Sequence, residues 1–163
     1  MEYNYYRYTK PECGVIINKM PIWYKEVEYS GDKIQGSITL QTQHEHDEIW
    51  GPESIMEINW EKKDRLKFFY YKEVQISIDM YNAVGIVVTE KNKDWLRSHE
   101  ITFWSGHRNK MIRKRFYSEK VMHCIFYCDI TETLFNVHTS IIGDRYENFK
   151  PFILKSFNSI ECH

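Results

Sequence analysis

The sequence predicts an α+β fold, in which a mostly antiparallel β-sheet carries one mid-chain helix and one C-terminal helix. Two patterns predict this class: short apolar or alternating segments recur between residues 13 and 142, and apolar residues recur at helical spacing in two longer segments. The chain has 163 residues, of which 42% are hydrophobic and 28% charged, a globular composition of ordinary domain size. We therefore expect one domain over residues 1–163.

The first half of the chain contains four predicted strands. The clearest is 33–43, where Ile34, Gly36, Ile38 and Leu40 alternate with polar residues, as in a half-buried strand. The segment 44–54 is polar and contains Gly-Pro, so we expect a loop there. The other three predicted strands are 13–20, 22–31 and 54–60.

The segment from Asp64 to Val84 fits two patterns. Leu66, Tyr70, Val74, Ile78 and Tyr81 lie at helical spacing, whereas Val74, Ile76, Ile78 and Met80 alternate as in a strand. The length of the segment favours the helix, and the strand stays an alternative.

The second half of the chain predicts strands and a closing helix. Residues 98–106 and 111–119 flank a polar turn, GHRNK, and read as a β-hairpin. The other strands are expected at 85–90, 121–130 and 133–142. After Gly143 apolar residues recur every three or four positions. Because proline is tolerated in the first helical turn, Pro151 predicts a regular helix that begins near Asn148.

The phrase HCIFYC, residues 123–128, places a histidine and two cysteines within six positions. On a strand, Cys124 and Cys128 share one face and His123 points to the other. The two cysteines are then about 13 Å apart at roughly 3.3 Å per residue, too far for a mutual disulfide or for one zinc ion. We therefore expect neither a redox pair nor a chelate within this strand.

Cys128 lies near the end of its strand and could meet a cysteine from elsewhere. The candidate is Cys162, which His163 follows at the end of the sequence. Three alternatives stay open: reduced cysteines used as small core residues, a Cys128–Cys162 disulfide, and a metal site of Cys128, Cys162 and His163.

SIMEINW leads into the predicted mid-chain helix, CDITETLFNVH contains a predicted late strand, and FKPFILKSFNSIECH contains the predicted closing helix. These three phrases resemble sequences of the PsbP-like fold, which is named after an extrinsic protein of photosystem II and is shared by a nuclear-import factor that binds a small GTPase. Ile153, Leu154, Ser156 and Phe157 match the I-L-x-S-F phrase of the closing helix. The resemblance implies an accessory domain that binds a partner or a ligand, and it brings no catalytic residues with it.

Two further segments are candidate sites. HEHDE, residues 44–48, suits a divalent metal through His44 and His46, with a solvated polar loop as the alternative. The basic segment 108–120 could bind phosphates or an acidic partner, or could be a solvated hairpin. We expect His99, Glu100 and His107 to be ordinary surface residues rather than an acid–base set. The predicted partner-binding or ligand-binding residues are Trp104, His107, Arg108, Arg113 and Arg115.

Charge and composition limit the function. The net charge of −1 argues against non-specific nucleic-acid binding, although the segment 108–120 keeps a nucleic-acid module as an alternative. MEYNYYRYTK lacks the apolar region of a signal peptide and no run is long enough to span a membrane, so we expect a cytoplasmic protein. Our interpretation is a small accessory domain that binds a protein or small-molecule partner on the sheet face or in a sheet–helix groove, without a required cofactor. A metal-dependent enzyme is the alternative. Trp50, Trp60, Trp95 and Trp104 would line that surface or fill the core.

Overall fold

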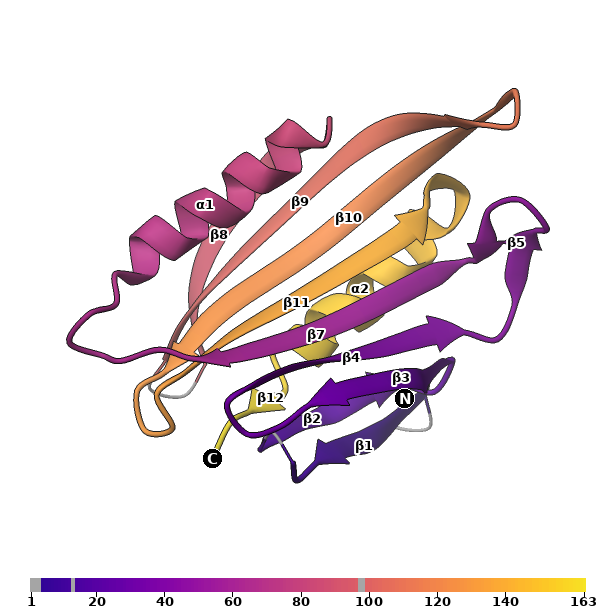
Figure 1. Ribbon diagram of the computed structural model, residues 1–163. Coiled ribbons are helices and arrows are strands. Elements are labelled where there is room, and N and C mark those ends of the chain that lie inside the picture. The colour runs from indigo at the N-terminus through magenta and orange to yellow at the C-terminus, as the bar shows by residue number, and fades with distance from the viewer. Residues whose placement is uncertain (1–3, 13, 97–98) are drawn as a thin grey trace.

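A computed structural model describes residues 4–12, 14–96 and 99–163. Its main feature is a seven-stranded antiparallel sheet in the order β3-β4-β7-β11-β10-β9-β8 (Figure 1). These strands are β3 Tyr24–Gly31, β4 Gln35–Thr42, β7 Ser54–Lys62, β8 Val87–Leu96, β9 His99–Ile112, β10 Arg115–Cys128 and β11 Thr133–Ile142.

Smaller elements complete the strand architecture. A second sheet has the order β1-β2-β12, with β1 at Tyr5–Lys10, β2 at Val15–Pro21 and β12 at Ile160–Glu161. The expected loop at 44–54 contains a small ladder of β5 Glu45–Asp47 and β6 Gly51–Pro52. Cys13, at the start of the predicted strand 13–20, lies outside the described residues.

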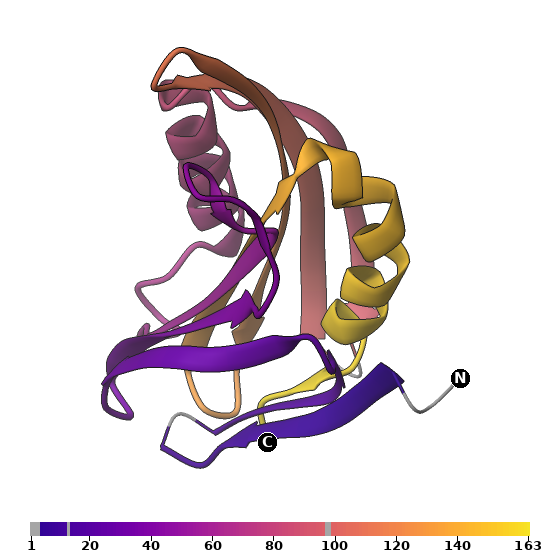
Figure 2. The same cartoon turned by 90° about the vertical axis from the view of Figure 1, so that its right-hand side faces the viewer.

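The two helices cover opposite faces of the main sheet (Figure 2). The segment from Asp64 to Val84, which fitted two patterns, contains helix α1, Tyr70–Ala83. Val74, Ile78 and Tyr81 are buried, whereas Ile76 and Met80 are exposed. Helix α2, Tyr146–Phe157, follows a short 3₁₀ turn, η2, at Gly143–Arg145.

The helix start predicted near Asn148 is wrong by two residues. Pro151 is the sixth residue of α2 rather than part of its first turn. Because proline has no amide proton, it cannot bond to the carbonyl of Glu147, four residues earlier. The helix continues through this position and buries Ile153 and Phe157 against the sheet.

Each sheet face has its own core. Strand β10 shows the alternation predicted from HCIFYC: Ile125 packs with the buried residues of α1, and Cys124, Phe126 and Cys128 pack on the face that α2 covers. The α2 side forms the larger core and also takes in β1, β2 and β12. The fold is thus the predicted α+β arrangement, and within the described residues no helix is long and apolar enough to cross a bilayer.

Candidate metal-binding and disulfide site

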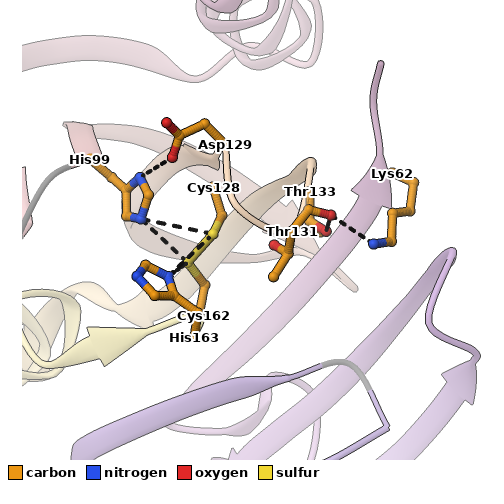
Figure 3. The surroundings of a disulfide bond; sticks show 8 residues. All are labelled: Lys62, His99, Cys128, Asp129, Thr131, Thr133, Cys162 and His163. Carbon is orange, nitrogen blue, oxygen red and sulfur yellow. Dashed lines mark hydrogen bonds and ion pairs between the residues drawn. A yellow bond between two sulfur atoms is a disulfide. The ribbon is translucent and has the colours of Figure 1, made fainter. Parts of the chain in front are cut away.

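Four side chains that can bind metals meet where the C-terminal tail reaches the main sheet. His99 begins β9, Cys128 ends β10, and Cys162 and His163 follow β12 (Figure 3). Because these residues come from three separate parts of the chain, the site forms only in the folded protein. We call His99, Cys128, Cys162 and His163 the tail cluster.

The β9–β10 hairpin brings His99 to Cys128. Its ladder pairs Arg115 with Ile112 and, at the far end, Phe126 with Ile101. The same register, continued by two residues, sets His99 opposite Cys128. The predicted turn GHRNK, residues 106–110, is wrong, because these residues lie inside β9 and the reversal falls at Arg113 and Lys114.

The pairing of β12 with β2 brings the tail to the same place. Ile160 pairs with Ile17, and the amide of Asn18 donates to the carbonyl of Ser159 at 3.2 Å. The Ser156 hydroxyl donates to the carbonyl of Lys19 at 2.6 Å. These contacts fix the chain just before Cys162, which is 5% exposed.

The sulfur atoms of Cys128 and Cys162 are joined as a disulfide, with the two Cα atoms 6.6 Å apart. Both imidazoles are directed at the sulfurs (Figure 3). His163 Nδ1 lies 3.2 Å from Cys162 Sγ and 3.5 Å from Cys128 Sγ. His99 Nε2 lies 3.6 Å from Cys162 Sγ and 3.8 Å from Cys128 Sγ. All four potential ligand atoms lie within 4.8 Å of one another.

The electrostatics of His99 favour a neutral imidazole. Burial lowers its pKa and His163 lowers it further, whereas the Asp129 carboxylate opposes both. An Asp129 oxygen lies 3.3 Å from Nδ1 of His99. The proton of the neutral ring therefore belongs on Nδ1, where it can be donated to Asp129. The Nε2 lone pair then faces the two sulfurs.

The distances in the tail cluster suit a tetrahedral metal once the cysteines are reduced. Zinc binds sulfur at about 2.3 Å and histidine nitrogen at about 2.0–2.1 Å, which places neighbouring sulfur and nitrogen ligands about 3.6 Å apart. The four sulfur–nitrogen distances lie on both sides of that value. In such a site the two sulfurs are about 3.8 Å apart, so a disulfide and a bound metal exclude each other. The carboxylate on the second nitrogen of a ligand histidine is a common support in zinc sites.

The other predicted metal-binding pair, His44 and His46, is not part of the tail cluster. His44 precedes β5, His46 lies within β5, and both are exposed. His46 is 3.9 Å from Asp47 and lies edge-on to the ring of Tyr117. Within the part of the chain that the structure describes, the tail cluster is the group in which ligand atoms of three or more histidine, cysteine or carboxylate side chains converge.

Of the five predicted partner-binding residues, Trp104 lies in the core and the other four lie along the β9–β10 hairpin. Trp104 is 2% exposed and stacks on His123, with the ring centroids 4.2 Å apart. Arg108 donates to Glu119 at 2.8 Å and to the carbonyl of Val84 at 2.8 Å. His107 lies within β9, Arg113 lies at the hairpin tip, and Arg115 begins β10.

Sequence reasoning missed His99 and Asp129 as members of the site. His99 is 5% exposed, so the expectation of a surface residue is wrong for it. The signal that could have found it is the hairpin register: a turn centred on Arg113 and Lys114 sets position 99 against position 128. Asp129 follows Cys128 directly but gives no such signal.

A hollow of about 450 Å³ lies on the sheet face that also carries α1. Cross-strand neighbours on β4, β7 and β11 line it with amide and hydroxyl groups, namely Ser37, Asn59 and Asn136. Its lining also includes the polar side chains of Gln35 and Glu61 and the apolar side chains of Trp60 and Leu134. It is an open hollow of ligand size with a mixed lining.

Comparisons with known proteins show the fold. The chain has a PsbP-like fold: it is similar to the solution structure of cyanobacterial PsbP (CyanoP) from Synechocystis sp. PCC 6803. The TM-score is 0.63 at 10% sequence identity, and the match covers 97% of this chain and 92% of that chain. No family model matches the sequence, and no curated protein matches it. At this level of sequence identity the likeness shows the architecture alone.

Proposed function

We propose that this protein is a PsbP-like accessory domain that binds one zinc-class metal ion through the tail cluster when its cysteines are reduced. The observation that carries the proposal is the convergence of two sulfurs and two imidazole nitrogens within 4.8 Å. The neutral, Asp129-supported ring of His99 adds to it, because its free lone pair faces the sulfurs.

The donor set selects the class of metal. Thiolate and imidazole ligands suit zinc, whereas magnesium and calcium prefer oxygen ligands. Four protein ligands fill a tetrahedral shell and leave no position for a substrate or an activated water. The proposed role of the ion is therefore structural or regulatory rather than catalytic. A reducing cytoplasm, the compartment that we propose, would keep both thiols available.

Metal titration tests this proposal. The protein, reduced with a phosphine and freed of metal without oxygen, is titrated with Zn²⁺ and separately with Co²⁺, whose visible spectrum reports tetrahedral thiolate ligation. We expect one tightly bound ion per chain, and loss of that site in Cys162→Ser and His99→Ala.

The double variant His44→Ala with His46→Ala is the matched control, because it removes two exposed imidazoles from the other predicted metal pair. It should leave binding unchanged. A reduced wild-type protein that binds no zinc, or a loss of binding in the control instead of in Cys162→Ser, contradicts the proposal.

The open sheet face supports a second candidate function, the binding of a small polar ligand. Helix α1 packs on β8, β9 and β10, and the hollow lies on the same sheet face over β4, β7 and β11, with Asn59, Asn136 and Ser37 exposed to solvent in part. We infer that free amino acids or monosaccharides are the chemistry that matches these amides and hydroxyls. Titration of both panels into ¹⁵N-labelled protein should shift the side-chain amide signals of Asn59 and Asn136. No shift with either panel contradicts this candidate.

A further inference from the structure

We propose that the tail cluster is a redox switch: a peroxide oxidises the two zinc-bound thiolates to the Cys128–Cys162 disulfide and releases the metal. This inference rests on the proposed function and names its regulation. Its basis is that the same two sulfurs serve both states, as metal ligands when reduced and as a cross-link when oxidised.

The backbone already suits the two states. The Cα atoms of Cys128 and Cys162 are 6.6 Å apart, within the range of about 4.4–6.8 Å that a disulfide spans. The sulfur–nitrogen distances of 3.2 to 3.8 Å meanwhile match tetrahedral ligation. Rotation about the two cysteine side chains therefore interconverts the states, and β10 and β12 keep their places.

Atoms and electrons balance as follows. One thiolate attacks a peroxide oxygen and becomes a sulfenic acid as hydroxide leaves, and the second thiolate attacks that sulfur and displaces the second hydroxide. The two sulfurs lose two electrons and hydrogen peroxide gains them. Two protons from solvent convert the hydroxides to two waters. Zn²⁺ leaves, because only two imidazoles remain where four ligands had been.

The surroundings of the sulfurs direct the oxidant to this pair. Cys128 is fully buried and Cys162 is nearly so, but exposed His163 covers them, and its ring contacts both sulfurs. Peroxide can thus enter when this exposed side chain moves. Cys124 has no such entry: it is buried beneath α2, and burial raises the pKa of its thiol well above the usual value. A protonated thiol is a poor nucleophile, so Cys124 should resist oxidation.

Tail attachment distinguishes the three forms of the protein. The disulfide ties Cys162 to β10 in the oxidised form, and the metal ties it there in the loaded form. In the reduced, metal-free form the tail is held by the two β12–β2 pairs and the hydrogen bonds of Ser156 and Ser159. The switch therefore exchanges one cross-link for another, and the metal leaves while the fold is kept.

Peroxide titration of the zinc-loaded protein tests the switch. Released zinc is followed with a chromophoric chelator, remaining thiols are counted after denaturation, and the disulfide is located by peptide mass spectrometry. We expect one zinc released for each pair of Cys128 and Cys162 thiols lost, a Cys128–Cys162 peptide, and Cys124 still reduced. Reduction with a phosphine followed by added Zn²⁺ should restore the loaded form.

Two variants complete the experiment. Cys124→Ala should release zinc as the wild type does, whereas Cys162→Ser, which lacks a metal ligand and starts without zinc, should form no disulfide at Cys128 under peroxide. Loss of the Cys128 and Cys162 thiols without zinc release, zinc release with no Cys128–Cys162 bond, or a loaded site that excess peroxide leaves intact would each overturn the switch while metal binding stands. A reduced protein that takes up no zinc fails at the loading step, and that result rejects the proposed function together with the switch.

Discussion

His99 Nε2 lies 3.8 Å from Cys128 Sγ because the two residues face each other across the open end of the β9–β10 hairpin. Cys162 enters from the C-terminal tail and joins the same pair. The hairpin thus sets half of the tail cluster through local register, and the β12–β2 pairing sets the other half through tertiary contacts.

The first prediction concerns the disulfide between Cys128 and Cys162. It closes a loop with a sequence separation of 34, so its loss should lower the free energy of unfolding by about 2–4 kcal/mol, in metal-free buffer. Urea unfolding of the oxidised protein, with and without a phosphine reductant, measures this. The reductant should leave Cys162→Ser unchanged, because that variant has no such bond to lose. Equal stabilities of the wild type under both conditions would contradict the prediction.

The second prediction concerns Asp129. Its carboxylate lies 3.3 Å from His99 Nδ1 and holds the ring so that Nε2 faces the sulfurs. Asp129→Ala should weaken zinc binding by the reduced protein about 10–100-fold, the usual effect of losing such a support. Competition with a chelator of known affinity measures the change. Glu132→Gln, in the same turn, is the control and should leave zinc affinity unaltered. Equal losses of zinc affinity in both variants would contradict the prediction, because they would show that only the negative charge of the turn matters.

The third prediction concerns pH. Burial lowers the pKa of His123 to about 3 and that of His138 to about 4, and the Tyr81 hydroxyl hydrogen-bonds with both rings. Their folded pKa values lie below the unfolded value near 6.5, so the unfolded chain binds more protons below pH 6.5. Stability should therefore fall as pH falls, by up to about 1.4 kcal/mol per pH unit for each histidine.

Urea unfolding of the wild type and of His138→Gln between pH 5 and 6 tests this. The variant has one buried histidine fewer, so its stability should change less steeply with pH, whatever its stability at pH 7.5. Identical slopes would show that His138 titrates in the folded protein as it does in the unfolded chain.

The fourth prediction concerns the hairpin turn. Arg113 and Lys114 have φ values of 49° and 67°, in the left-handed region that side chains rarely adopt. Two-residue hairpin turns of this kind favour Asn-Gly. The double variant Arg113→Asn, Lys114→Gly should therefore be more stable than the wild type by roughly 1 kcal/mol. Thermal unfolding measures it, and Arg115→Gly, outside the turn, should destabilise instead. A destabilised Asn-Gly variant would argue against this turn and against the register that places His99.

Local patterns were enough to predict much of the fold. The alternation of β10 correctly separated His123 from Cys124 and Cys128. In the mid-chain segment the helical pattern was the right one: Val74, Ile78 and Tyr81 are buried on one side of α1. Ile76 and Met80, which the strand pattern would bury, are exposed. Strand β12 escaped prediction, since its two residues pair with β2 through contacts that only the folded chain makes.

The candidate site was predicted in part. Cys128, Cys162 and His163 were recognised as an open set of alternatives, but His99 was assigned to the surface. The reason lies in the turn: GHRNK has the composition of a loop, whereas the true reversal uses Arg113 and Lys114, two residues with no intrinsic preference for positive φ. The polar residues 107–110 instead serve the strand, where Arg108 and Lys110 pair with buried Glu119.

The measurement that tests the central claim most directly is X-ray absorption at the zinc edge of the reduced, zinc-loaded protein. Two sulfur scatterers at about 2.3 Å and two nitrogen scatterers at about 2.0 Å are the predicted first shell. A shell of nitrogen and oxygen alone, with no sulfur, would contradict the claim that Cys128 and Cys162 hold the ion with His99 and His163.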